Sequence, residues 1–297
     1  MPTGLNKKYF HNTGFDQTKL SAQIGVFLQK HVKGHAPNAS ELSLKIINRL
    51  ALDARVNDLR YMAYMLATAC HESKETRPFP RPAPAKVAVA ANAKGKAKPP
   101  NTAPMKLWVV FDPINELGKG AGLKYFEPVK VLETSAGAEI VEKDGDQFLV
   151  GRDGKMSKGN PNRVGSLAGG AVSPVYVAAQ GAELCYFGRG MVQLTWWGNY
   201  ANASRRLGME LGLLLHPERA LEYDISYEIM VRGMIEGNWF THHKCSEFFS
   251  DGMTDYVGAR KIINPADKRH HTIVAVYAEA FEQLLMDSRV LTANESQ

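Results

Sequence analysis

A stretch of proline, alanine and lysine is the feature that most limits how this chain can fold. It runs from Arg77 to Pro104, with no acidic residue and few large apolar ones. Proline restricts the backbone and lacks an N–H donor, and a segment so poor in apolar side chains cannot build a packed core. We therefore predict a flexible, basic, partly extended loop, with the regular structure on either side of it. The loop is either a tolerated surface insertion or a tether to an anionic glycan or lipid surface.

The segment before this loop is predicted to be helical. Residues 16–72 carry apolar side chains at helical spacing. Ser40 is the expected N-cap of a second helix, and Asn57 or Asp58 the expected N-cap of a third. The third helix would end at Glu72.

The segments after the loop alternate in character. Residues 128–156 combine β-branched runs with Asp-Gly turns, which predicts a small inserted hairpin or meander. Residues 157–181 are rich in Gly, Ala, Ser and Asn and are expected to be loop. Helical patterns then return at 199–214, 217–237, 244–250, 253–264 and 272–286. The predicted fold class is mainly α (α+β), as one domain over residues 1–297 with insertions at 77–107 and 127–181.

Composition places the chain among ordinary globular proteins. Hydrophobic residues make up 44% and charged residues 22% of its 297 positions. No apolar run reaches the roughly 18–20 residues that span a bilayer, and we expect no signal peptide. The cysteines, Cys70, Cys185 and Cys245, are too few and too scattered for a disulfide framework, which fits synthesis in a reducing compartment. A net charge of +6 favours an anionic partner without choosing among nucleic acid, membrane and cell wall.

The segment from Tyr186 to Tyr200 has the composition of a ligand-binding site. Its fifteen residues include three glycines, an arginine and five aromatic side chains. Glycine lets the backbone approach a ligand closely, and aromatic faces stack on ring-shaped groups. Gln193, Thr195 and Trp197 alternate, so an extended run would place them on one face. The alternative is a buried aromatic strand after a glycine turn.

This segment resembles the Y-[YF]-G-R-G-x-[VI]-Q-L-[ST]-x-x-x-N-Y signature of glycoside hydrolase family 19, which includes plant-type chitinases and many phage endolysins. The specified positions match in order. The resemblance extends over about residues 45–76, 110–126 and 183–285. It implies a lysozyme-like glycoside hydrolase fold, here with an inserted β-hairpin, and no metal or organic cofactor.

Cleavage of a glycosidic bond usually needs two carboxyl groups, one to protonate the leaving oxygen and one to activate water or attack. Glu72 is the candidate acid. The segment from Tyr64 to Ser73 resembles the family's A-x-x-x-H-E-[TS] pattern, whose glutamate is the general acid and whose histidine is here His71. Partial burial at the end of an apolar helix is expected to favour the protonated form of Glu72.

The second carboxylate is displaced along the chain. In relatives the base follows soon after the acid, where this chain has Pro82. The segment from Asp112 to Gly120, with Lys124-Tyr125-Phe126, resembles a P-[VI]-x-E-x-G…K-Y-F pattern of lysozyme-like relatives, which makes Glu116 the expected base. Glu75 is the fallback, although a carboxyl one helical turn from Glu72 leaves poor room for a water.

The resemblance also assigns substrate-binding side chains, namely His71, Tyr186, Arg189, Gln193, Thr195, Trp197, Asn199 and Asn264. Gln193, Thr195 and Asn199 would bind substrate or hold the attacking water, and Arg189 would brace the site. Asn264 belongs to an Ile-Ile-Asn triplet whose asparagine contacts sugar in the family.

One end of the cleft departs from the family pattern. Chitinase members often carry an arginine after the Ile-Ile-Asn triplet, where this chain has Ile273. The plant enzymes also carry disulfides. The chain is therefore more similar to the phage and bacterial lysozyme-like branch.

Other chemistries have weaker signals. The paired histidines, His242-His243 and His270-His271, point apart on any regular element, so we expect no metal site. A Cys–His hydrolase has no local signature, and the lysine-rich stretch lacks the interleaved aromatics of a nucleic-acid site.

The sequence thus predicts a peptidoglycan hydrolase that cuts β-1,4 bonds with Glu72 as acid and Glu116 as base, with inversion. A chitinase is the first alternative, and a non-catalytic wall-binding or partner-binding module is the second, favoured if Glu116 lies far from Glu72. The expected protein is a monomer without stable membrane insertion, made in the cytoplasm and active at the bacterial wall. It would be a phage endolysin or an antibacterial effector, carried there by a holin or a delivery system.

Overall fold

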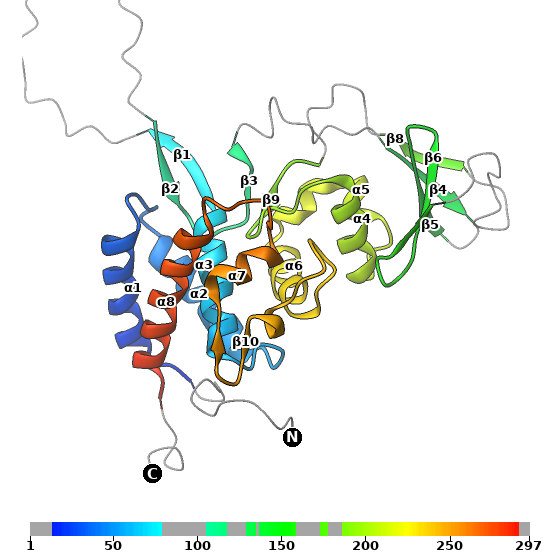
Figure 1. Cartoon of the computed structure of the whole chain (residues 1–297). Coiled ribbons are helices and arrows are strands. Elements are labelled where there is room, and N and C mark those ends of the chain that lie inside the picture. The colour runs from blue at the N-terminus through cyan, green and yellow to red at the C-terminus, as the bar shows by residue number, and fades with distance from the viewer. Residues whose placement is uncertain are drawn as a thin grey trace, which may run out of the picture.

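The computed structural model describes residues 14–78, 105–117, 129–134, 137–158, 173–177 and 186–290. They form a mixed α+β fold with a helical body and several small sheets (Figure 1). Residues 79–104 of the predicted basic loop, together with Lys124-Tyr125-Phe126 and Cys185, lie outside the described residues. Within the described ranges, no helix is both long enough and apolar enough to cross a bilayer.

The helical body is built around one buried helix. Every residue of α3 (Leu59–Glu72) from Leu59 to His71 is buried, as expected for a helix whose apolar residues surround its axis. The neighbouring helices are α1 (Gln17–His31), α2 (Ala39–Leu52) and α8 (His271–Ser288). Helices α1 and α8 pack antiparallel, since the N–H of Asp16 donates to the carbonyl of Ser288 near one end of the pair. The rings of Phe27 and Phe281 pack between them, tilted by 38° with centroids 4.2 Å apart.

The predicted helix starts are partly correct. Asp58 caps α3 by accepting from the N–H of Arg60, as expected. Ser40 does not cap α2, because that helix begins at Ala39 after the N-cap residue Asn38. The cap position of α2 has no side-chain hydrogen bond. Its start is therefore set by packing of its apolar face rather than by capping chemistry.

Two short ladders carry the chain from the helical body to the rest of the fold. Strand β1 (Lys74–Pro78) pairs antiparallel with β2 (Met105–Val109), with Lys74 opposite Val109. Strand β3 (Ile114–Asn115) pairs antiparallel with β9 (Arg189–Gly190). The two ends of the predicted 77–107 insertion are thus strands rather than loop. Their pairing returns the chain to the end of α3.

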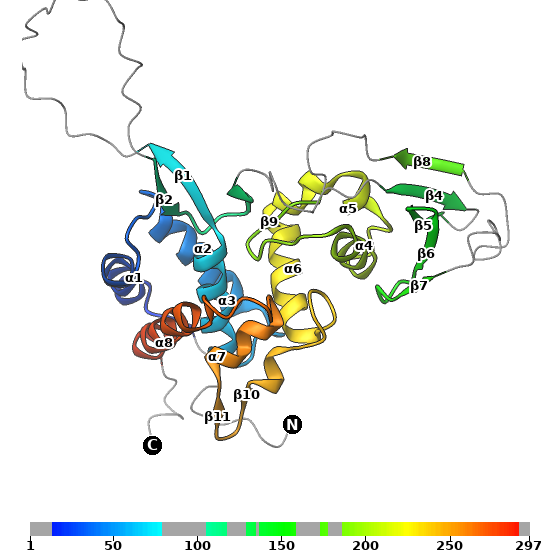
Figure 2. The same cartoon turned by 45° about the horizontal axis from the view of Figure 1, so that its top comes forward.

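The predicted inserted hairpin is a larger sheet. Its antiparallel strands are β4 (Lys130–Thr134), β5 (Gly137–Lys143), β6 (Asp146–Val150), β7 (Met156–Lys158) and β8 (Ser173–Val177), in the order β7-β6-β5-β4-β8. The prediction of loop over 157–181 was therefore wrong at β7 and β8. Strand β8 pairs with the distant β4 rather than with its neighbour in sequence, so local composition gave no sign of it. Figures 1 and 2 show this sheet beside α4, at the opposite end of the molecule from α1 and α8.

The C-terminal third is helical, but in shorter pieces than predicted. Its elements are α4 (Trp197–Arg206), α5 (Gly212–Leu215), the 3-10 turn Pro217–Leu221, α6 (Tyr223–Glu236), the 3-10 turn Cys245–Glu247, β10 (Phe249–Ser250), β11 (Met253–Thr254), α7 (Tyr256–Ala259) and the 3-10 turn Arg260–Ile262. The predicted helix over 199–214 is divided where Gly208 and Glu210 take positive φ. The predicted helices over 244–250 and 253–264 are interrupted by the β10–β11 hairpin, which buried Arg60 holds by donating to the carbonyls of Ser250 and Met253.

Candidate active site

A pocket of about 220 Å³ brings together residues from four separate segments. The sequence candidates that line it are Glu72, Glu116, Gln193, Thr195 and Asn264. Glu72 ends α3, Glu116 follows β3, and Asn264 follows the 3-10 turn after α7. Two carboxylates, two amides and a hydroxyl in one polar hollow can bind a hydroxyl-rich and amide-rich ligand.

The Glu72 carboxylate is held by a buried arginine. Its side chain is 16% exposed, and its Oε1 lies 2.6 Å from Nη1 of Arg260, whose own side chain is 3% exposed. The second terminal nitrogen of Arg260 lies 2.9 Å from Oδ2 of Asp267. The guanidinium therefore bridges two carboxylates.

Ser73 connects the end of α3 to the segment that carries Glu116. The N–H of Val110 donates to the carbonyl of Ser73, and the N–H of Phe111 donates to its hydroxyl, both at 2.9 Å. Because β1 and β2 pair just beyond this point, the chain re-enters the body beside Glu72 however many residues lie between the strands. This pairing explains how a carboxylate so far along the chain can share a pocket with Glu72.

Glu116 is fixed by the backbone of the glycine-aromatic segment. Its N–H donates to the carbonyl of Gly188 at 2.7 Å, and the N–H of Gly188 donates back to its Oε2 at 2.9 Å. Burial raises the pKa of Glu116, the hydrogen bond from Gly188 opposes this shift, and the charge of Glu72 adds to it. A carboxylate with a raised pKa is a stronger base for water near neutral pH.

The glycines of Gly188-Arg189-Gly190 are required by space. A Cβ at Gly188 would lie 2.7 Å from Oε1 of Gln193 and 3.3 Å from Cβ of Glu116. Gly190 has φ of +86°, and a Cβ there would lie 2.7 Å from Oγ of Ser226. Both positions therefore exclude side chains so that β9 can lie close to its neighbours.

The segment after Gly190 is not an extended strand. Residues 191–193 form a turn, Gln193 has φ of +54° and Trp196 φ of +71°, and α4 begins at Trp197. The predicted alternation of Gln193, Thr195 and Trp197 on one face was therefore wrong, and so was the alternative of a buried aromatic strand. Gln193 instead donates from Nε2 to the carbonyls of Ile114 and Gly190, which ties β3 to β9 beside the pocket.

Two other candidates in this segment lie beneath the pocket. The guanidinium of Arg189 is buried over the ring of Phe187, at 3.7 Å from its centroid, and donates to the hydroxyl of Tyr200 at 2.9 Å. Tyr186 is fully buried and donates to the carbonyl of Leu214. Arg189 and Tyr186 thus occupy the core that supports β9 and α4.

Three further candidates are not among the residues that line the pocket. The ring of Trp197 packs on Phe148 of β6, with centroids 5.3 Å apart, and so joins α4 to the five-stranded sheet. Asn199 is half-buried in the first turn of α4, where its N–H donates to the carbonyl of Trp196. Glu75 lies in β1, where it pairs with Trp108.

No family model, no curated protein and no solved structure matches this chain. The functional argument therefore rests on the geometry of the pocket and on the chemistry of the side chains that line it.

His71 lies behind Glu72 in a cluster of polar groups. Burial is the largest cause of a pKa of about 3 for His71, and the charges of Lys74, Arg260 and His270 lower it further. Donor atoms of His71, Asp267 and His270 lie within 4.8 Å of one another. Such atoms can bind metal ions, but Asp267 is already paired with Arg260 and His270, and Lys74 lies 3.3 Å from Nδ1 of His71. These positive neighbours would repel a cation, so the cluster is better described as an ionic network.

The sequence did not single out Arg260, which is the main cation of the pocket. Ile273 stands where the resembled chitinases often carry an arginine after the Ile-Ile-Asn triplet, and in this structure an arginine before the triplet contacts Glu72. The available signal was an arginine directly after the uncharged segment Tyr256–Ala259, since arginine is rarely buried unless it is paired. Asp267, which shares this arginine, was not singled out either.

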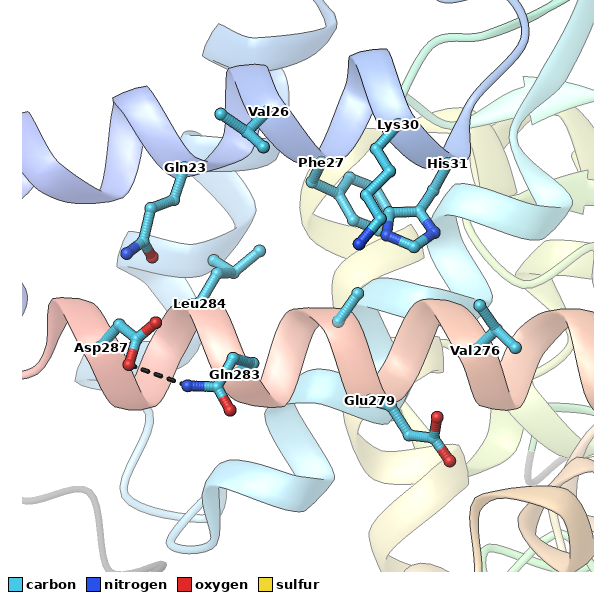
Figure 3. Close-up of a pocket in the computed structure, with 11 residues that line it drawn as sticks. Gln23, Val26, Phe27, Lys30, His31, Val276, Glu279, Gln283, Leu284 and Asp287 are labelled. Carbon is cyan, nitrogen blue, oxygen red and sulfur yellow. Dashed lines mark hydrogen bonds between the residues drawn. The ribbon is translucent and has the colours of Figure 1, made fainter.

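A second hollow lies on the surface between α1 and α8 (Figure 3). It has a volume of about 470 Å³ and shares no lining residue with the carboxylate pocket. Its floor is apolar, with Phe27 and Leu284, and its rim is polar, with Lys30, Glu279 and Asp287. Its two carboxylates, Glu279 and Asp287, both lie on α8, so they do not face each other across the hollow. Nothing in the described structure covers it.

Proposed function

We propose that this protein is a lysozyme-like glycoside hydrolase that cleaves β-1,4 bonds in the glycan strands of bacterial peptidoglycan. The observation that carries the proposal is the shared pocket of Glu72 and Glu116, which reach it from different segments of the chain. Glycosidases need two carboxyls on either side of the bond that breaks. The resemblance of both glutamate segments and of the Tyr186–Tyr200 segment to glycoside hydrolase family 19 supports the same conclusion.

In the proposed mechanism Glu72 protonates the leaving oxygen and Glu116 activates the attacking water. The raised pKa of Glu116 suits a base, since it accepts a proton from water more readily. Asp267 competes with Glu72 for Arg260, which weakens the hold of the guanidinium on the acid. Gln193, Thr195 and Asn264 would bind the sugar hydroxyl and acetamido groups. We propose that the reaction inverts the anomeric centre, through one direct attack by water.

The site of action that we propose is the bacterial wall, reached as a phage endolysin or a delivered effector. Peptidoglycan is anionic, and the chain carries a net charge of +6, which favours their encounter. A chitinase would use the same carboxylates on a polymer of N-acetylglucosamine. A comparison of peptidoglycan and chitin as substrates therefore distinguishes a peptidoglycan hydrolase from a chitinase.

The first test is loss of turbidity of purified peptidoglycan, with chitin as the second polymer. Glu72→Gln and Glu116→Gln should each lower the rate on peptidoglycan by about 10²–10⁴-fold, the usual contribution of a general acid or base. Glu279→Gln, an exposed glutamate on α8, is the matched control and should leave the rate unchanged. Hydrolysis of chitin alone would transfer the proposal to a chitinase, and hydrolysis of neither polymer would refute it.

A second experiment separates the roles of the two carboxylates. An aryl glycoside with an acidic phenol as leaving group needs no protonation, so Glu72→Gln should retain most of its activity on such a substrate. Glu116→Gln should not, because water must still be activated. The reverse pattern would exchange the two roles. The proton NMR spectrum of the fresh product reports whether the anomeric centre inverts.

A further inference from the structure

A continuous chain of polar contacts leads from the surface to Glu72. Nδ1 of His270 lies 2.8 Å from Oδ1 and 2.9 Å from Oδ2 of Asp267. Asp267 pairs with Arg260 at 2.9 Å, and Arg260 pairs with Glu72 at 2.6 Å. The His270 side chain is 46% exposed, whereas that of Arg260 is 3% exposed. The exposed end of this network is therefore a histidine and its buried end is a pocket carboxylate.

The groups around His270 differ in their ability to change charge near neutral pH. Burial and three positive neighbours keep His71 neutral, with a pKa of about 3. Burial alone would raise the pKa of Asp267, but bonds from Arg260 and His270 lower it, so it stays ionised. Histidine is the side chain that ordinarily titrates in this range. Two titratable groups lie directly against His270, namely Asp267 in the turn before α8 and His71 of α3. Behind Asp267 come Arg260 and then Glu72, and behind His71 comes Lys74 of β1.

We propose that His270 is a positioning residue for Glu72, and that its charge sets how firmly Arg260 holds the Glu72 carboxylate. When His270 is protonated, it neutralises part of the charge on Asp267, so more of the Arg260 field acts on Glu72. When His270 loses its proton, Asp267 attracts Arg260 more strongly, and one positive charge disappears from the neighbourhood. Glu72 is then more easily protonated. This inference rests on the proposed function, because the proton that Glu72 holds is the one it would donate.

The catalytic consequence concerns the alkaline limb of the pH–rate profile, where the general acid loses its proton. His270→Lys keeps a positive charge at all working pH values, and His270→Asn never carries one. The alkaline limb of kcat/KM should therefore move to lower pH in His270→Lys. We expect a shift of about half a pH unit, the order of effect of one unit charge that does not touch the carboxylate directly. In His270→Asn the limb should stay at or above that of the wild type. A purely structural role would lower the rate in both variants without moving the limb, and would overturn the proposal.

The matched control is His216→Asn, at an exposed histidine paired with Glu218 outside this network. Its profile should coincide with that of the wild type. Thermal unfolding of each variant shows whether the network substitutions leave the fold intact, and His270→Arg, which also keeps its positive charge, replaces His270→Lys if that variant does not fold.

A measurement without substrate separates this inference from the proposed function. The carboxyl carbon of Glu72 can be followed by NMR in protein labelled at glutamate and assigned by its loss in Glu72→Gln. Its titration midpoint should fall by about half a pH unit in His270→Lys relative to His270→Asn. Equal midpoints would refute the coupling even if the enzyme cleaves peptidoglycan. A shifted midpoint without hydrolysis of either polymer would refute the proposed function and leave the coupling standing.

Discussion

The two carboxylates of the pocket are held in different ways. Glu72 is held by side-chain charge, through the buried guanidinium of Arg260 and the network behind it. Glu116 is held by the main chain, in a reciprocal pair of hydrogen bonds with Gly188. Charge acts over a distance and responds to protonation, whereas a backbone pair responds to the local path of the chain. The two sides of the pocket should therefore fail under different perturbations.

The largest effect on stability is expected when Arg260, which holds the Glu72 carboxylate, loses its charge. Arg260→Met leaves Glu72 and Asp267 close together without their shared partner, and should lower the free energy of unfolding by about 3 kcal/mol at pH 7. The cost should shrink on acidification, as the carboxylates take up protons. Urea denaturation at pH 7 and at pH 5 measures both.

The control for this substitution is Arg219→Met, at an exposed pair with Glu222 in the 3-10 turn after α5. Exposed pairs contribute about 0–1 kcal/mol. Equal losses in the two variants would mean that burial adds nothing to the role of Arg260.

A single added methyl group at Gly188 should disturb the hydrogen bonds that hold Glu116. Gly188→Ala places a Cβ 2.7 Å from Oε1 of Gln193 and 3.3 Å from Cβ of Glu116, so both side chains must move. We expect about 1–2 kcal/mol of destabilisation from overpacking, with a larger loss of activity because the carboxylate is displaced. Thermal unfolding and the turbidity assay, run on the same preparation, compare the two effects.

Gly25→Ala is the matched glycine substitution, since a Cβ in α1 at this position meets no atom within 4 Å. Alanine in a helix interior should stabilise the protein by up to about 1 kcal/mol. If Gly188→Ala likewise loses neither stability nor activity, the close packing at Gly188 is not needed to position Glu116.

A smaller effect concerns the raised pKa of Glu116. The Glu116 carboxyl holds its proton more tightly in the folded protein than in the unfolded chain. Glu116 therefore favours folding most below its ordinary pKa of about 4.5. That contribution is lost as the pH rises through the raised value of the folded protein. Relative to the wild type, Glu116→Gln should gain a little stability between about pH 4 and pH 7, despite its loss of activity. Unfolding midpoints across this range test the sign, and a variant less stable at pH 7 than at pH 4, relative to wild type, would contradict it.

The smallest effect should come from salt, because Arg260, the cation of the pocket, is buried and both carboxylates are at least partly buried. Between about 50 and 300 mM salt, screening should weaken the attraction between the positive chain and the anionic wall. We expect KM for peptidoglycan to rise by a few-fold while kcat stays nearly constant. A fall in kcat instead would show that the ionic network itself is exposed to the solution.

Much of the helical body follows from local pattern. Helices α1, α2 and α3 lie within the predicted helical segment 16–72, and α8 covers the predicted helix 272–286, because a strong apolar period over three or more turns leaves few other ways to bury those side chains. Asp58 was recognisable as a cap for the same local reason. Shorter elements were predicted less well, since 3-10 turns and two-residue strands are set by contacts with distant segments. The interruption of 244–264 by the β10–β11 hairpin depends on Arg60, which is far away in sequence.

The pocket shows the same division. The sequence by itself pointed to Glu72, Glu116, Gln193, Thr195 and Asn264, because the segments that carry them resemble motifs of glycoside hydrolase family 19. It did not indicate that β1 and β2 would pair across the insertion, that β8 would join β4, or that Arg260 would bridge Glu72 and Asp267. Those arrangements depend on which surfaces meet when the chain closes, and the free energy of a buried charge is known only once its neighbours are in place. The sequence determined which carboxylates are candidates for the site, and the tertiary structure decided what surrounds them, because burial and charge depend on neighbours that are distant in the chain.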